Sequence, residues 1–376
     1  MLIKNGTIHD AVHEAPYVAD IAVENSKIKA IAPGLKPAKG EEVLDAAGKQ
    51  VFPGMVDAHS HVGLDDFGLG NAGKDYNEKT SCVTPELRGI DSFYPQDQGV
   101  RLSLESGVTT VCTGPGSSNV LGGTFVTVKT CGTCVDDMAI RADAAMKCAF
   151  GENPKNSYSG KGCTVRMGIA AKLRETLFNA AAYLEAREGG KSPKPDLKME
   201  ALIPVLKGEM PLKAHAHRAD DILTAIRIAK EFGVKLTLEH CTEGALIVDE
   251  LVRAGVPVAI GPLLASYTKS ELFNKTAATA GILADAGVPV CVIDDCPVVL
   301  PQYLGTSAGV CIRYGMKPFD ALRAVTLNAA RHIGEEARIG SLEVGKDADI
   351  VLADGDILQC TTRILTVLVD GKRVIG

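Results

Sequence analysis

Short apolar segments alternate with amphipathic segments between residues 51 and 335. In the amphipathic segments apolar residues recur every three or four positions, which is typical of helices, whereas the short apolar segments are typical of buried strands. This alternation predicts strand–helix units around a parallel sheet. The clearest candidate helices are 219–232, 243–254 and 318–332. The candidate strands are 55–61, 108–114, 124–130, 146–151, 212–217, 235–241, 257–261 and 289–294.

The order of these segments favours a closed barrel. An open dinucleotide-binding sheet has a G-x-G-x-x-G turn after its first strand, and this sequence has none at that position. The segment after the second candidate strand is too short for a crossover helix, so the number of strands there stays open. Both ends of the chain show short β patterns around turn residues. We therefore expect an α/β fold, with a (β/α)8 TIM-like barrel over 53–335 and a small β-sandwich subdomain built from 1–52 and 336–376.

Charge and cysteine content narrow the partners and the compartment. The 376 residues carry 40 basic and 46 acidic side chains, a net charge of −6 without a long basic run, which argues against a nucleic-acid partner. The sequence has neither a run of 18 apolar residues nor a signal peptide, which argues against a membrane partner and against export. The 11 cysteines are scattered, several of them within apolar segments, as expected of reduced thiols. We expect a cytoplasmic protein that acts on a small molecule.

Histidines concentrate at the ends of the candidate strands. Of the eight in the chain, five lie there: His59, His61, His215, His217 and His240. Residues i and i+2 of a strand point to the same side, with Cα atoms roughly 6–7 Å apart. Two imidazoles in that arrangement can converge on one ion at Zn–N distances of about 2.0–2.1 Å. The spacing alone therefore fits metal binding at the carboxyl ends of the strands, where barrel enzymes place their chemistry, and it fits equally well two polar residues held at a strand end.

Longer motifs add a family resemblance. VFPGMVDAHSH at residues 51–61 resembles the first-strand signature of the amidohydrolase superfamily, the metal-dependent hydrolases that act on amide and related C–N bonds. LTLEH at 236–240 resembles the sixth strand of that family, and TLNAAR at 326–331 and GSLEVGKDADIV at 340–351 resemble its closing helix and return strand. The resemblance spans nearly the whole chain in the expected order. It implies a TIM-like barrel, a small β domain from the two termini, and one or two divalent metal ions.

The resemblance also assigns metal ligands. His59 and His61 match the metal-binding pair of the first strand, His215 the ligand of the fifth strand and His240 the ligand of the sixth. Related enzymes often have Asp-His-Pro-Val at the eighth strand, which aligns with DCPV at 295–298 and selects Asp295 over its neighbour. The histidine of the family is replaced here by cysteine, which removes a proton donor at that position.

The bridging ligand is the remaining metal ligand. Many members of the family use a carboxylated lysine, and others use a glutamate at the end of an earlier strand. We expect Glu152 to bridge, because a carboxylate is already anionic and follows an apolar strand here; Lys147 and Lys155 are the alternatives. The stretch GENPK at 151–155 resembles an imidazolonepropionase-like subgroup of the family.

Three further polar residues lie near these positions. His217 either binds metal or polarises the substrate carbonyl, unless Asp220 or Asp221 holds it as a loop histidine. Asp57 shares strand parity with His59, so we expect it inside the barrel, where it could orient an imidazole. Glu239 has the opposite parity to its neighbour His240, so we expect it to face the helix layer, paired with a cation or exposed at the strand end.

These observations together predict hydrolysis of a C–N bond, an amide or cyclic amide, in a small metabolite by metal-activated water. Asp295 would take the proton and deliver it to the leaving nitrogen, and His217 would be the second catalytic residue. Zinc suits the histidine-rich ligand set, with Mn, Fe and Co left open. The alternatives are a deaminase or dipeptidase of the same superfamily, or a barrel that has lost catalysis and serves as a scaffold. Substrate identity and assembly into a homo-oligomer stay open.

Overall fold

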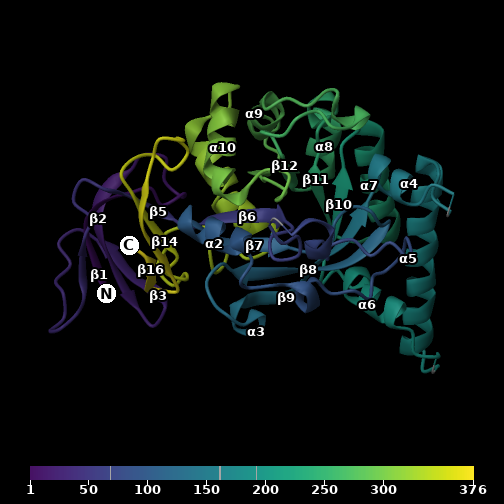
Figure 1. Ribbon diagram of the computed structural model, residues 1–376, viewed down its shortest axis with the longest axis horizontal. Helices are drawn as coiled ribbons and strands as arrows, with labels where there is room; N and C mark the ends of the chain where they lie inside the picture. Colours follow the sequence, from purple (N-terminus) through teal and green to yellow (C-terminus); the bar gives the residue numbers. More distant parts are fainter. Residues whose placement is uncertain (68, 161, 192) are drawn as a thin grey trace.

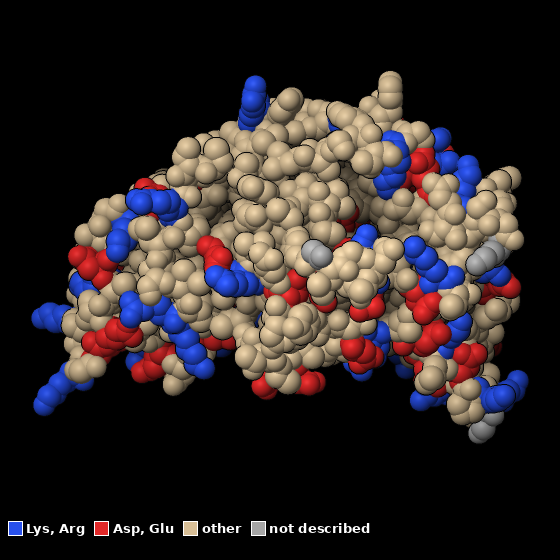
Figure 2. All heavy atoms as spheres, in the orientation of Figure 1, with Lys and Arg blue, Asp and Glu red and all other residues tan. Residues whose placement is uncertain are grey.

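The computed structural model describes the chain except for residues 68, 161 and 192. Two sheets organise it (Figure 1): one built from both ends of the chain, at the left of the view, and one in the middle of the chain surrounded by helices. Acidic and basic side chains are interspersed over the face shown in Figure 2, in keeping with the near balance of charges.

The central sheet has eight strands that follow one another in chain order, and each corresponds to a candidate strand of the sequence. Its first and last strands approach each other, so the sheet is a nearly closed barrel. The strands are β6 (Met55–Ser60), β7 (Val108–Thr113), β8 (Leu121–Lys129), β9 (Ala139–Ala149), β10 (Leu212–Ala216), β11 (Leu236–His240), β12 (Val258–Ile260) and β13 (Val290–Val292).

One strand departs from the expected (β/α)8 pattern. Strand β8 is antiparallel to both β7 and β9, whereas the other neighbouring pairs of the barrel are parallel. Only residues 114–120 separate β7 from β8, and a parallel connection needs a crossover of about a dozen residues. The chain therefore turns back on itself at this point, and the prediction of an all-parallel barrel is wrong for β8.

Helices connect and cover the barrel strands. Helix α7 (Ala219–Phe232) has the predicted bounds and ends at Gly233, whose φ of +66° suits glycine. Every helix among the described residues is too short or too polar to cross a membrane. The others are η1 (Gly70–Gly73), α1 (Gly89–Ser92), α2 (Gln98–Glu105), α3 (Val135–Met138), α4 (Glu152–Ser157), α5 (Arg166–Glu188), α6 (Leu197–Leu206), η2 (Gly244–Leu246), α8 (Val248–Ala254), η3 (Ser270–Leu272), α9 (Ala278–Asp285), η4 (Pro301–Tyr303), α10 (Leu304–Arg313), α11 (Pro318–Ala324) and α12 (Leu327–His332).

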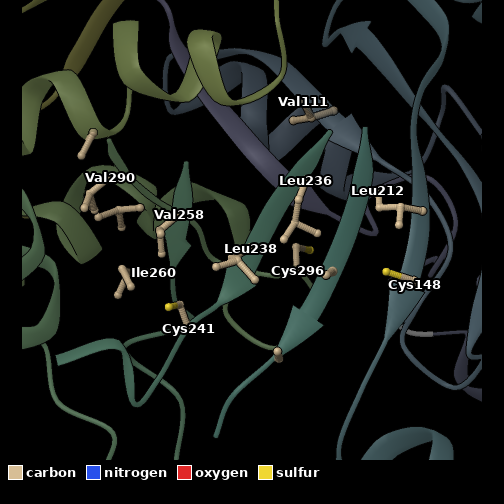
Figure 3. Packing of buried hydrophobic residues seen from close by; sticks show 14 of the residues in the cluster. Val111, Cys148, Leu212, Leu236, Leu238, Cys241, Val258, Ile260, Val290 and Cys296 are labelled. Atoms are coloured by element: carbon tan, nitrogen blue, oxygen red, sulfur yellow. The ribbon is translucent and has the colours of Figure 1, made fainter. Parts of the chain in front are cut away.

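The alternation of residues along the barrel strands separates an apolar outer core from a polar interior. Leu212 of β10, and Leu236 and Leu238 of β11, belong to the core between the strands and the helices (Figure 3). The residues between them point the other way: Lys213 is paired in register with Thr237, and His215 with Glu239. The burial of apolar side chains on the outer face thus fixes which polar side chains enter the barrel.

The terminal sheet joins the two ends of the chain. Strand β14 is antiparallel to β5, so that Leu352 lies opposite Val51, and both belong to a separate apolar core. The eight strands form one hydrogen-bonded sheet; its folding into a sandwich and the division at residues 53 and 336 stay predictions. The strands are β1 (Leu2–Ile8), β2 (Tyr17–Glu24), β3 (Lys27–Ala32), β4 (Val43–Asp45), β5 (Gln50–Pro53), β14 (Ile350–Ala353), β15 (Ile364–Val369) and β16 (Lys372–Ile375).

Candidate metal centre

Six side chains gather where strands β6, β10, β11 and β13 end, and we call them the imidazole cluster. The five histidines lie within a strand or directly after it, and the aspartate follows β13 by three residues. A cavity of about 530 Å³ opens onto all of them except His59, which is fully buried. The members of the cluster are His59, His61, His215, His217, His240 and Asp295.

Two groups within the cluster have the spacing of metal ligands. Oδ1 of Asp295 lies 3.2 Å from Nε2 of His61 and 3.5 Å from Nε2 of His59. The ligand atoms of His59, His240 and Asp295 lie within 4.8 Å of one another, and so do those of His215, His217 and His240. Two atoms that bind one zinc ion at about 2.0–2.2 Å are at most roughly 4.4 Å apart. Because His240 belongs to both groups, the spacing fits two neighbouring divalent ions after small shifts.

Hydrogen bonds at the far ring nitrogens orient two of these imidazoles. Nδ1 of His61 donates to the Gly114 carbonyl at 2.7 Å, and Nδ1 of His240 donates to the Gly261 carbonyl at 2.8 Å. Since a carbonyl oxygen only accepts, Nδ1 carries the proton in both rings and Nε2 keeps its lone pair. Within the described part of the chain, Nε2 of His240 and Oδ1 of Asp295 are buried without a hydrogen-bond partner. Such orphaned acceptors fit a bound cation.

The electrostatics of the cluster favour neutral imidazoles beside an ionised carboxylate. Burial lowers the pKa of His240 to about 4. Burial and then the neighbouring Lys147 lower the pKa of His59 well below its ordinary value. Burial alone would raise the pKa of Asp295, but His240 and His61 outweigh it and hold that pKa far below its usual range. Neutral imidazole and ionised carboxylate are the forms that bind a metal ion.

The carboxylate expected to bridge two ions lies outside the cluster. The side chain of Glu152, the first residue of α4, accepts a hydrogen bond from Ser270 instead. The structure places the amine of Lys147, fully buried on β9, 3.1 Å from Nε2 of His59. The reason is local: Gly151 has a φ of +82°, so the chain leaves the strand direction before it reaches Glu152. Lys147 is therefore the better candidate for the bridging position.

The prediction that Glu239 faces the helix layer, made from strand parity, is wrong. The Glu239 side chain is fully buried inside the barrel; Oε2 lies 3.0 Å from Nδ1 of His59 and 3.1 Å from Nζ of Lys213. Its other oxygen lies 2.8 Å from Nε2 of His332. Glu239 thus does pair with a cation, but within the barrel, where it orients a predicted metal ligand.

The error has an identifiable origin in the backbone. Glu239 lies opposite His215 in the register of β10 and β11, so both face the interior. His240 also reaches the interior because its φ of +73° breaks the alternation at the strand end. The sequence signal that could have revealed this group is Lys213, a lysine inside an apolar strand with the same parity as the two histidines that follow it.

The other candidates near the site are also located. Nδ1 of His217 lies 2.7 Å from Oγ1 of Thr242, so neither Asp220 nor Asp221 holds this ring. Asp57 lies inside the barrel as expected, where it accepts a hydrogen bond from the backbone of His59 at 3.3 Å. Lys155 lies half-buried on α4.

At the eighth strand, Asp294 and Asp295 have separate surroundings. Asp294 accepts a hydrogen bond from Ser307 of α10 at 2.5 Å, and burial raises the pKa of its carboxyl to about 7. Asp295 has a φ of +51°, so the chain turns after Asp294 and brings the second carboxylate beside the imidazoles. Cys296, the residue after Asp295, is fully buried.

Two curated relatives are similar to this chain in sequence over part of their own length. An amidohydrolase named tasK, from Hapsidospora irregularis, is 27% identical over 94% of this chain and 40% of its own length. An imidazolonepropionase from Streptococcus pyogenes serotype M49 (strain NZ131) is 29% identical over 48% of this chain and 50% of its own length. The chain therefore spans about half or less of the length of these relatives.

A family model and a solved structure complete the comparison. The model of the amidohydrolase family matches residues 207–374, which include β10 to β13 and most of the cluster. The crystal structure of an amidohydrolase from Thermotoga maritima MSB8 is 39% identical, with a TM-score of 0.96 over 100% of this chain and 99% of that one. Because fold and sequence agree over the whole length of that protein, this chain belongs to the amidohydrolase family.

Proposed function

We propose that this protein hydrolyses a C–N bond, an amide or cyclic amide, of a small metabolite by means of metal-activated water. The observation that carries the proposal is the convergence of imidazole nitrogens and one ionised carboxylate beside a cavity of about 530 Å³. A bound divalent ion would lower the pKa of water towards neutrality and polarise the scissile carbonyl. Zinc suits this ligand set, and manganese is the first alternative to test.

The ligand set that we propose differs by one residue from the sequence prediction. His59, His61 and Asp295 would hold one ion, and His215 and His240 the other. Lys147 replaces Glu152 as the bridging residue, because its buried amine lies 3.1 Å from His59. Reaction of that amine with CO2 would form an N–C bond, release one proton and leave a carboxylate, the chemical group expected at the bridging position.

The chain's own residues would supply the proton transfers. Oδ1 of Asp295 would take a proton from the attacking water and return it to the leaving nitrogen. His217 lines the cavity, and its contact with Thr242 is made through Nδ1. Its Nε2 is therefore free to contact the substrate carbonyl or an ion. The neighbouring Glu239 would keep the His59 ring in place by accepting from its Nδ1 at 3.0 Å.

The test is a substrate panel of N-acyl amino acids, dipeptides and cyclic amides. Each is assayed with protein loaded with Zn²⁺, loaded with Mn²⁺, or treated with a chelator. We expect release of an amine or opening of a ring only with the metal-loaded protein. Fully loaded protein that hydrolyses no compound of any class would contradict the proposal and favour a binding or scaffold role.

A further inference from the structure

One buried carboxylate near the imidazole cluster comes from a segment that the sequence analysis did not select. Glu271 lies in η3, between β12 and α9, and its side chain is fully buried. Its Oε1 lies 3.8 Å from Nε2 of His217 and 3.9 Å from Nε2 of His215. Lys269 contributes an ammonium 2.8 Å from the same oxygen. The oxygen thus faces two imidazoles of the cluster and one cation.

The surrounding chain holds this carboxylate in place. Its second oxygen, Oε2, accepts the backbone N–H of Glu152 at 2.9 Å. A Cβ atom on Gly151 would lie only 2.5 Å from Oε2, so a larger residue there would displace the carboxylate. The left-handed φ of Gly151, +82°, further favours glycine at this position. Segments distant in the sequence therefore fix Glu271 beside the cluster.

The neighbouring His217 is oriented in the same way as a metal ligand. Its Nδ1 is 2.7 Å from the Thr242 hydroxyl, which leaves Nε2 turned towards the other imidazoles. Its ring centroid lies 4.7 Å from that of His215 and 4.7 Å from that of His240. Ligand atoms of one ion at about 2.0–2.2 Å are separated by roughly 3–4 Å, which matches the distances from Glu271 to both imidazoles.

We propose that Glu271 and His217 are ligands of the ion held by His215 and His240. The inference rests on the proposed function, because that function requires the ions. Together with the bridging carboxylate on Lys147, these four side chains would fill the coordination shell of that ion, whereas catalytic sites keep an open position. The ion of His59, His61 and Asp295 would keep that position, which assigns water activation to the side of the cluster where Asp295 lies. Lys269 competes with this second ion for Glu271.

The experiment measures ion affinities rather than activity. Metal-free protein is titrated with Zn²⁺ in competition with a chromogenic chelator, and with Co²⁺, whose visible absorption reports coordination. We expect two ions in the wild type. Glu271→Gln should weaken one of them about tenfold or more and leave the other unchanged. Glu335→Gln is the matched control, because that buried carboxylate pairs with Arg141 and has no contact with the cluster or with Glu271, and it should leave both affinities unchanged.

A second variant separates a ligand from a structural carboxylate. Lys269→Met removes the competing ammonium, so it should tighten the ion that Glu271→Gln weakens. If the Glu271 carboxylate served only to pair with Lys269, the two variants would not change the ion affinity in opposite directions. The absence of opposite changes would therefore overturn the inference. His217→Gln should weaken the same ion and carries the test if Glu271→Gln does not fold.

The outcomes distinguish this inference from the proposed function. Two ions bound with equal affinity by the wild type and by both Glu271→Gln and His217→Gln would overturn the inference alone. Wild-type protein that binds no divalent ion would overturn the proposed function and the inference with it.

Discussion

Two groups of charged and titratable side chains, buried except for Asp370 of the first, show opposite ways of accommodating polarity in this fold. The first, which we call the junction cluster, consists of Lys129 on β8 with Asp347, Asp349 and Asp370 near the end of the chain. The Lys129 amine lies 3.1 Å from Asp347 and 3.3 Å from Asp370, and it also pairs with Asp349. Burial alone would lower the pKa of Lys129, but these three carboxylates outweigh it and raise that pKa.

In the imidazole cluster, burial instead outweighs the attraction that Asp295 exerts on the rings of His217 and His240. Burial, and then the neighbouring imidazole of His240, lower the pKa values of His215 and His217 well below the ordinary value. Neutral rings bring lone pairs, and Asp295 brings an oxygen without a hydrogen-bond partner in the described part of the chain. The comparison teaches that a buried group satisfied by its own neighbours serves the fold, whereas one left with orphaned acceptors requires a cation from outside.

The largest effect should come from the carboxylate of the imidazole cluster. Asp295→Asn keeps an oxygen ligand but cannot take up a proton, so we expect kcat to fall about 10³-fold, or about 4 kcal/mol. Steady-state kinetics measure the loss, and elemental analysis should find the ion content unchanged. Unchanged kcat in a fully loaded variant would remove Asp295 from the proton transfers.

The junction cluster should respond in stability rather than in chemistry. Lys129→Met leaves the buried Asp349 without its cation, whereas Asp347 keeps Lys27 and Arg338, and breaking a buried ion pair costs about 3–5 kcal/mol. Urea unfolding of the metal-free protein measures the change. Lys29→Met is the control, because Lys29 pairs with Glu24 at 2.8 Å on the exposed surface and should leave the midpoint unchanged. A loss of ion binding in folded Lys129→Met would contradict the separation between the two clusters.

Glu239 shares features of both clusters. It pairs with the Lys213 cation, as the carboxylates of the junction cluster pair with Lys129, and it also contacts the predicted ligand His59. Replacing it with glutamine weakens the hold on Nδ1 of His59, and outer partners of this kind change metal affinity about 10–100-fold, or about 1.4–2.7 kcal/mol. Zn²⁺ competition titration measures the change. Glu335→Gln is the matched control, because that carboxylate pairs with Arg141 instead. Equal affinities in the wild type and Glu239→Gln would restrict Glu239 to a role in folding.

Much of the barrel and of the imidazole cluster could be predicted because the signals are local. The eight apolar segments marked the strands, and the spacing of His59 and His61 marked them as a pair at a strand end, whereas Asp295 beside them came from the family resemblance. Strand parity is a local property too, and it correctly placed Asp57 inside the barrel.

The remaining features depend on contacts between distant segments. The left-handed backbone at His240 allows two consecutive side chains to face inward, and no local sequence pattern predicts this conformation. The position of Lys147 beside His59 requires β9 and β6 to curl around one barrel, and Glu271 reaches the cluster from a connecting segment rather than a strand. Sequence spacing alone could not choose between Glu152 and Lys147, because the turn at Gly151 decides it.

The smallest expected effect is a pH dependence of the junction cluster. Burial alone would raise the pKa of Asp347, but Lys129 and then Lys27 outweigh it and lower that pKa. A lowered carboxyl pKa contributes stability that is fully present above the unfolded value of about 3.9 and is lost as the pH falls through the lower folded value. The difference in unfolding free energy between the wild type and Lys129→Met should therefore narrow as the pH falls from 5 to 3, measured by urea midpoints of metal-free protein. A constant difference would mean that Lys129 acts through the packing of its methylene groups, and the contrast drawn between a charge-compensated cluster and an uncompensated one would lose its electrostatic basis.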